Sequence, residues 1–193
     1  MSKTFLLLAI KDLISNPVKA WEKIYTDDKQ VNVIRNGFLF PLIFLISVSA
    51  LAGSLLYSNS KMPRAYSVFA GLECFVLFYF SIFATAYFLT QITTRFNLKN
   101  NFTVSFRLIV YSLVPLLICQ VFSRLFESLM FINILSFFGL YIFYTGIEKF
   151  LNPPENKKMP LLIATFMTFI GTFIVSDYLL TKIFIKIYYA FFS

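Results

Sequence analysis

The sequence predicts an all-α protein: a polytopic membrane helix bundle with five transmembrane helices preceded by N-terminal amphipathic helices. Of its 193 residues, 59% are hydrophobic and only 13% are charged, whereas soluble domains carry about 45–50% apolar and about 25% charged residues. A soluble core of this size cannot bury such an excess, because small domains keep much of their surface in water. The composition therefore excludes a disordered chain, a collagenous repeat and an ordinary cytosolic enzyme.

The first 36 residues are predicted to form two short amphipathic helices on the cytoplasmic face of the membrane. Asn16 followed by Pro17 is typical of a helix N-cap and first helical residue. In the turns that follow, Trp21 lies on an apolar face, and Lys19 and Lys23 lie on the opposite face. We expect Pro17, Lys19, Trp21 and Lys23 to form a membrane-surface anchor, with Trp21 at the lipid interface. The alternative is a small helical cap that packs on the bundle.

Five apolar segments are long enough to cross a bilayer, which requires about 20 apolar residues in a helix. They are residues 37–57, 65–94, 102–122, 128–147 and 159–180. The third and fourth segments need a turn between them, because one helix over residues 102–150 would be about 73 Å long. Residues Arg124–Glu127 are the only charged stretch near its middle. Paired prolines at 153 and 154 end the fourth segment.

Lysine and arginine are distributed unequally between the two ends of these segments. With the N-terminus in the cytoplasm, twelve of the 17 basic residues face the cytoplasm, as the positive-inside rule requires. We therefore expect a plasma-membrane protein with a cytoplasmic N-terminus and an external C-terminus. Anionic inner-leaflet lipids are the expected partners of the basic N-terminal face. No nucleic-acid partner is predicted, because the basic residues are scattered and form no stripe.

Ionisable residues within the spans are the first candidates for a functional site, because a charge inside a bilayer is costly. Glu73, Arg124, Glu127 and Asp177 fall at similar depth near the outer ends of their spans. We expect them to form an outward-facing polar cluster in which Arg124 pairs with a carboxylate. The alternative is that these side chains extend to the headgroup region and only fix the helix ends.

A second candidate site lies in the third span. Spacing by four residues places Arg107, Tyr111 and Pro115 on one helical face. Pro115 leaves the carbonyl of Tyr111 without its usual helical donor. We expect a kink or pocket there, with Ser112 or a neighbouring helix satisfying that carbonyl. The alternative is a kinked packing helix whose Arg107 extends to the membrane surface.

The residues that most enzymes use are missing or dispersed. The chain has no histidine, two cysteines and six glycines. It therefore lacks the commonest general base and transition-metal ligand. It also lacks the thiols of a four-cysteine zinc site and a glycine-rich phosphate loop. We predict no enzyme activity, no catalytic or metal-binding residue and no cofactor.

Three local patterns resemble the Yip domain family of Ypt/Rab-interacting, five-span membrane proteins, in its bacterial branch. The segment from Asn16 to Ile24 is similar to the family's Pro, basic, x, Trp, x, x, Ile pattern. Residues Tyr111–Pro115 are similar to its Tyr-Ser-x-x-Pro in the third span, and Tyr141–Lys158 to its fourth-span exit. The resemblance covers nearly the whole chain. Eukaryotic members bind prenylated Rab-type GTPases through a longer cytoplasmic segment than the 36 residues before the first span here, so we do not expect that partner.

The resemblance implies a non-enzymatic integral membrane protein with a scaffold or membrane-organising role, acting with a membrane-protein partner or as a homo-oligomer. The alternative is a small transporter or permease subunit that uses Glu73 and Asp177. A polar-lined cavity reaching Glu73 would favour transport, whereas a dry interior packed with phenylalanine would favour the scaffold.

Overall fold

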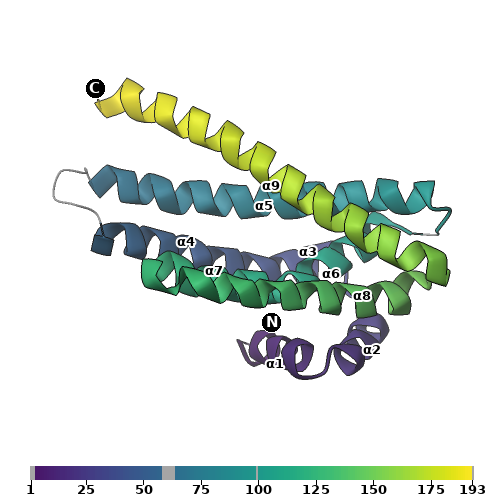
Figure 1. Cartoon of the computed structure of the whole chain (residues 1–193). Coiled ribbons are helices and arrows are strands. Elements are labelled where there is room, and N and C mark those ends of the chain that lie inside the picture. The colour runs from purple at the N-terminus through teal and green to yellow at the C-terminus, as the bar shows by residue number, and fades with distance from the viewer. Residues whose placement is uncertain (1–2, 58–63, 99, 193) are drawn as a thin grey trace.

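The computed structural model describes residues 3–57, 64–98 and 100–192, and every regular element within these ranges is helical. The long helices run side by side in an elongated bundle (Figure 1). Four helices are long and apolar enough to cross a membrane, and a fifth span results when one bent helix pair is counted as a single crossing. The predicted all-α membrane bundle is therefore confirmed.

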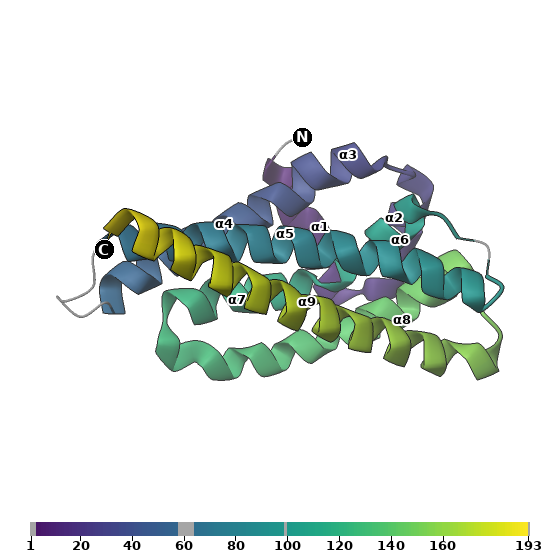
Figure 2. The same ribbon diagram turned by 90° about the horizontal axis from the view of Figure 1, so that it is seen from above.

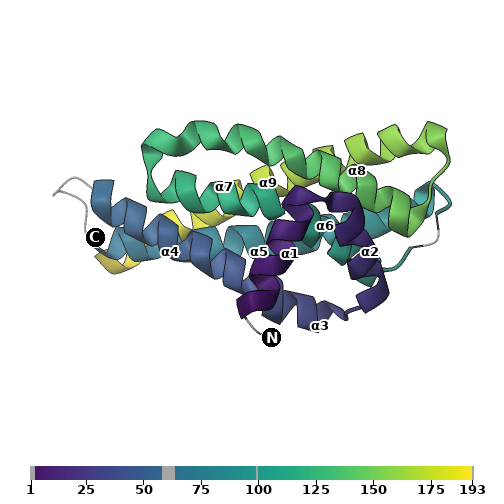
Figure 3. The ribbon, with the colours of Figure 1, turned by 90° about the horizontal axis from the view of Figure 1, so that it is seen from below.

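The N-terminal segment folds into two helices that form a hairpin, α1 (Lys3–Ser15) and α2 (Pro17–Asp27). The Asn16 side chain accepts a hydrogen bond from the backbone N–H of Lys19 at 3.2 Å, and Pro17 occupies the first helical turn. The cap expected from the sequence is therefore present. Figure 3 shows the hairpin lying across the direction of the long helices.

The first two spans are long helices joined through residues outside the described ranges. The first runs through α3 (Val31–Ile34), the π-helical turn η1 (Arg35–Leu39) and α4 (Phe40–Tyr57). It is thus helical from Val31, whereas the prediction began the span at residue 37. The second is α5 (Arg64–Arg95), which coincides with the predicted segment and packs against α4 and α9.

The third and fourth spans depart from regular α-helices. The third is divided into α6 (Phe102–Ser112) and α7 (Val114–Leu125), which meet at an angle of 45°. The fourth begins with the 3₁₀ helix η2 (Glu127–Phe137) and continues as α8 (Phe138–Leu151). A 3₁₀ run of this length is unusual, because its hydrogen bonds are poorer than those of an α-helix. None of its residues is buried, so packing in the bundle interior does not stabilise it.

The fifth span, α9 (Glu155–Phe192), is much longer than the predicted residues 159–180. It starts after Asn152, which ends α8 in the left-handed conformation with φ 39°, and after the two prolines that cannot continue that helix. α9 packs on α5 and α8 and inclines away from the rest of the bundle toward its C-terminal end (Figures 1 and 2).

The bundle interior is a mainly apolar core. Its largest fully buried side chains come from the N-terminal hairpin, the first span, α5 and α6. They include Trp21, Phe38, Phe78 and Phe106. By contrast, α9 exposes an apolar surface along its length, including Met159, Ile163, Met167 and Ile174, as expected of a helix that faces lipid.

Trp21 is part of this core, so the prediction that it anchors the chain in the lipid interface is wrong. Its side chain is 0% exposed, and its Nε1–H donates a hydrogen bond to the carbonyl of Ile142 at 2.8 Å. A Cβ at Gly146 would lie 2.7 Å from the indole, so the glycine on α8 opens the slot that the ring fills. Burial with a satisfied N–H is the usual solution for a large amphipathic ring.

The other anchor residues divide between the core and the surface. Pro17 is buried, whereas Lys19 and Lys23 are exposed, and the Lys23 ammonium pairs with Asp12 at 2.6 Å. The N-terminal hairpin is therefore a helical cap packed on the bundle, which was the alternative interpretation of the sequence.

Replacing Trp21 by Ala should release the hairpin. Truncating a buried Trp costs about 3–5 kcal/mol, so tryptic cleavage within residues 17–30 should accelerate by more than about 100-fold. The neighbouring Val18, at 53% exposure, is the matched control, since Val18→Ala should change the opening free energy by less than about 0.5 kcal/mol. Equal cleavage rates for the two variants would contradict the packing described above.

Candidate functional site: a polar cavity at one end of the bundle

All four residues of the predicted polar cluster line one cavity of about 680 Å³, a volume typical of ligand pockets. Five elements surround it. Its polar lining residues are Ser54 and Tyr57 on α4, Glu73 on α5, Gln120, Ser123 and Arg124 on α7, Glu127 and Asn133 on η2, and Asp177 and Thr181 on α9. Residues separated by more than one hundred positions in sequence therefore share one site.

A close helix crossing forms one wall of the cavity. A Cβ added to Gly53 on α4 would overlap the carbonyl oxygen of Arg124 at the end of α7. Only the absence of a side chain at Gly53 allows α4 and α7 to approach so closely. This contact fixes the end of α7 beside α4, and thereby places the Arg124 side chain at the cavity.

The charged groups of the cavity contact neutral partners. Arg124 Nε donates to Gln120 Oε1 at 3.3 Å, and Glu73 Oε1 accepts a hydrogen bond from the Thr181 hydroxyl at 2.8 Å. Among the described residues, no carboxylate lies within salt-bridge distance of Arg124. The expected ion pair is therefore wrong: the guanidinium reaches back one helical turn to Gln120, while Glu73 and Asp177 lie on α5 and α9.

Amides and hydroxyls that were not expected from the sequence complete this lining. The Asn133 side-chain oxygen on η2 accepts from Gln120 at 3.5 Å and from Ser123 at 3.4 Å. The signal that could have found two of them is the helical spacing of Gln120, Ser123 and Arg124, which places three polar residues on one face of an otherwise apolar helix. Asn133 carries no such signal, because its neighbours on both sides are apolar.

The polar lining ends at the apolar core. Leu77, one turn beyond Glu73 on α5, lines the cavity and is 2% exposed. Phe78 and Ile82 follow on α5, and Ile46 lies on α4 one turn before Ala50 of the lining; all three are fully buried. In the described part of the chain, the cavity is thus a recess at one end of the bundle, and buried apolar side chains fill the interior next to it.

The second candidate site is divided by the bend that was expected at Pro115. Tyr111 is 2% exposed and packs edge-on against Trp21 and tilted against Phe38, with centroid distances of 6.1 Å and 4.8 Å. Ser112 instead lines a mainly apolar cavity of about 240 Å³ between α6, α7, η2, α8 and α9, and Asn133 lines both this cavity and the polar cavity. Pro115 is buried at the start of α7. Arg107 and Tyr111 line another cavity of about 300 Å³ beside the N-terminal hairpin, so the structure keeps this pair together and separates Ser112 and Pro115 from it.

Ser112 does not compensate the carbonyl that Pro115 frees. Its hydroxyl is buried, and no hydrogen-bond partner lies within reach among the described residues, so that part of the prediction is wrong. The chain accommodates the proline through a break, since Leu113 turns at φ −81° and ψ 0° and α7 begins anew at Val114. A Cβ at Gly139 would lie 2.5 Å from the Ser112 carbonyl oxygen, so α8 packs directly on the bend.

Arg107 has a structural role, and the structure does not support the alternative in which its side chain extends to the membrane surface. Its side chain is 3% exposed. Nη1 donates to Asp28 at 2.7 Å, and Nε donates to the carbonyl of Lys29 at 2.9 Å, as does Nη2. Asp28 is the left-handed residue that ends α2, with φ 36°. Arg107 thus binds the end of the N-terminal hairpin to α6.

The donor set at these sites does not suit a metal ion. Within the described ranges, no three residues of the His, Cys, Asp and Glu types come together as metal ligands would. Cys74 lines the polar cavity and Cys119 lies on α7, and both are buried free thiols. What the polar cavity offers is a mixed set of hydrogen-bond donors and acceptors of both charge signs.

Arg107→Gln should loosen the hairpin more than Asp28→Asn. The first change removes charge-assisted hydrogen bonds worth about 1.5–3 kcal/mol from a buried side chain. The second weakens one contact of a carboxylate that is 84% exposed, and should cost less than about 1 kcal/mol. Asn also tolerates the left-handed conformation at this position. Amide hydrogen exchange along α2 measures both effects, and the reverse order would contradict the assigned role of Arg107.

The comparisons with known proteins agree with this architecture. The family model for the Yip1 domain matches residues 11–176, which run from the last residues of α1 through the bend of the third span into α9, and end just before Asp177. No curated protein and no solved structure matches the chain significantly. Because the match covers most of the chain, this protein belongs to the Yip1 domain family.

Proposed function

We propose that this chain is a non-enzymatic integral membrane protein that organises its membrane by binding a polar group of a membrane component in the cavity. The observation that carries the proposal is the convergence of Glu73, Arg124, Glu127 and Asp177 on one cavity. Charges placed inside a bilayer are costly, and a recess that gathers them gives a partner molecule a polar site in an otherwise apolar environment. The partner is a lipid, another membrane protein or a second copy of this chain.

The depth of the cavity distinguishes binding from transport. One observation favours the transporter alternative, because the polar lining of the cavity reaches Glu73. A transport path must also continue to the other end of the bundle, but buried Phe78, Ile82 and Ile46 occupy that level of the interior. A recess closed by such a core supports binding from one side rather than passage.

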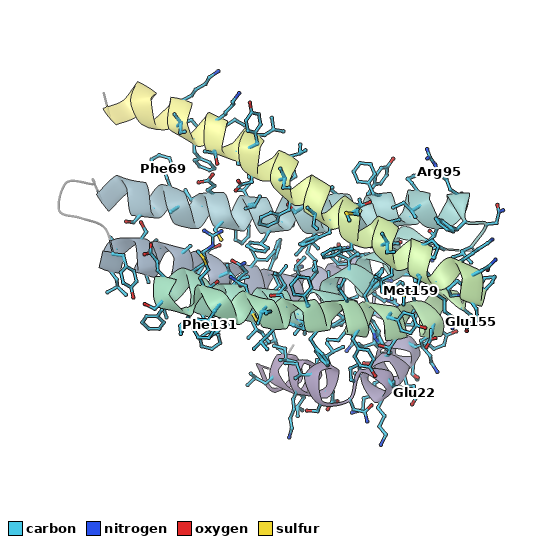
Figure 4. All side chains as sticks on the ribbon, in the orientation of Figure 1. Glu22, Phe69, Arg95, Phe131, Glu155 and Met159 are labelled. Atoms are coloured by element: carbon cyan, nitrogen blue, oxygen red, sulfur yellow. The ribbon has the colours of Figure 1, made fainter. Side chains whose placement is uncertain are left out.

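We also propose a plasma-membrane location with the hairpin in the cytoplasm and the cavity on the outer side. Lys157 on α9 donates to the carbonyl of Phe96 beside Arg95, so basic residues of α5 and α9 lie at the same end of the bundle. Figure 4 shows Arg95 and Glu155 at this end and Phe69 at the other. The hairpin also exposes Leu7, Leu8 and Ile14, which suit contact with the membrane surface, and its lysines suit anionic lipids.

One-sided access to the cavity is the testable consequence. In a Cys74→Ala, Cys119→Ala background, single cysteines are introduced by Asp177→Cys at the cavity, by Ser81→Cys in the core below it and by Lys23→Cys on the hairpin. With a membrane-impermeant maleimide, Asp177→Cys should react in intact cells and Lys23→Cys only after lysis. Ser81→Cys should react in neither case, because Ser81 is 0% exposed.

Two outcomes would refute parts of the proposal. Reaction of Ser81→Cys from either side would reveal a continuous path and favour the transporter. Reaction of Asp177→Cys only after lysis would reverse the orientation. Crosslinking and pull-down from native membranes then separates protein partners from lipid, since a reproducible protein partner supports the scaffold role directly.

A further inference from the structure

Among the residues that the structure describes, the charges of the polar cavity form no ion pairs. Arg124 contacts a neutral amide and Glu73 a neutral hydroxyl, and no ion pair joins Asp177 or Glu127 to any described residue. The cavity therefore presents one guanidinium and three carboxylates, a net negative set with one strong cationic group. Inside a bilayer such groups are retained where they pair or line a polar cavity, so the lining is complementary to a ligand that carries both charge signs.

Exposed apolar side chains on η2 and α9 lie next to the cavity. Met130 on η2 lines the cavity and is 69% exposed, and Ile174, one turn from Asp177 on α9, is 60% exposed. η2 and α9 still touch where Phe137 meets Phe166, with ring centroids 6.4 Å apart. Beyond that contact α9 inclines away (Figure 1), so the cavity lies between an η2 wall and an α9 wall that both carry lipid-exposed side chains.

We propose that the cavity binds the headgroup of a phospholipid that carries a primary ammonium, as phosphatidylethanolamine does; this rests on the proposed binding function. The phosphate is bound by the Arg124 guanidinium, which suits phosphate oxygens. The ammonium donates to the carboxylates of Glu73 and Asp177. The acyl chains leave between η2 and α9 over Met130 and Ile174.

The charge pattern selects this headgroup among common phospholipids. A primary ammonium has three N–H donors, and the lining offers carboxylate and amide acceptors for them. A choline headgroup is cationic but donates no N–H bond, and a glycerol headgroup leaves the carboxylates without a cation. A dissolved metal ion would leave Arg124 without an anion, and a free phosphomonoester would make no use of the exposed apolar side chains next to the cavity.

The test is a competition among lipids of equal acyl chains. The purified full-length protein is mixed in detergent with equal amounts of ethanolamine, choline and glycerol phospholipids, and the lipids retained are counted by native mass spectrometry. We expect the ethanolamine lipid to exceed each of the others by about tenfold or more, since one charge-assisted hydrogen bond is worth at least that factor. Free phosphoethanolamine at the same concentration should not compete, because it lacks acyl chains.

Variants assign the binding to the cavity. Arg124→Gln and Asp177→Asn should each lower retention of the ethanolamine lipid by about tenfold. Both side chains are exposed within the cavity, so the fold should tolerate the changes, and intact protease protection of the hairpin checks this. Glu155→Gln is the matched control, because Glu155 lies on the same helix as Asp177 at the opposite end and is 86% exposed.

Three results would overturn the inference: equal retention of the three lipids, unchanged retention in both cavity variants, or full competition by free phosphoethanolamine. These failures differ from a failure of the proposed function. One-sided labelling of Asp177→Cys without lipid selectivity would keep the binding recess and reject only this ligand. Labelling of Ser81→Cys would reject the recess itself.

Discussion

The structure depends on one constraint, which is that a charge within a hydrocarbon layer must face either a partner or a polar cavity. The chain has few charges within its spans, and the fold brings those at one end to a common recess. Arg124 lies at the end of α7, Glu127 at the start of η2, Glu73 on α5 and Asp177 on α9. Phenylalanine and aliphatic side chains then fill most of the interior of the rest of the bundle.

Three glycines allow the close helix contacts on which this arrangement depends. Gly53 lets α4 contact the carbonyl of Arg124, Gly139 lets α8 pack on the bend after Ser112, and Gly146 holds the Trp21 indole. Because each glycine has no side chain, a neighbouring backbone or ring can occupy that space. Helices in lipid achieve close packing in this way. The N-terminal hairpin covers one side of the bundle (Figure 3), and one end of the bundle holds the recess.

The local sequence of the hairpin allows Trp21 to be either an interfacial anchor or a core residue. Trp21 has the apolar ring and polar N–H of an interfacial anchor, and the local sequence does not reveal what lies opposite. The partners are Ile142 and Gly146, more than one hundred residues away. Arg107 is a similar case, since its contacts with Asp28 and Lys29 cross about 80 residues of sequence. Membership of the Yip1 domain family identifies a Yip-type membrane protein, and the recess is the site that we propose for binding a partner.

Local properties of the sequence determined the helical class, the five long apolar segments, the cap at Asn16 and the break at Asn152, because hydropathy, capping and proline act over a few residues. They also indicated which intramembrane charges share a depth. Only the tertiary structure decided that these charges line one cavity without pairing, that Trp21 is core, and that Arg107 binds the end of the hairpin. Those outcomes depend on contacts between distant helices, which side-chain type and spacing along one helix do not specify.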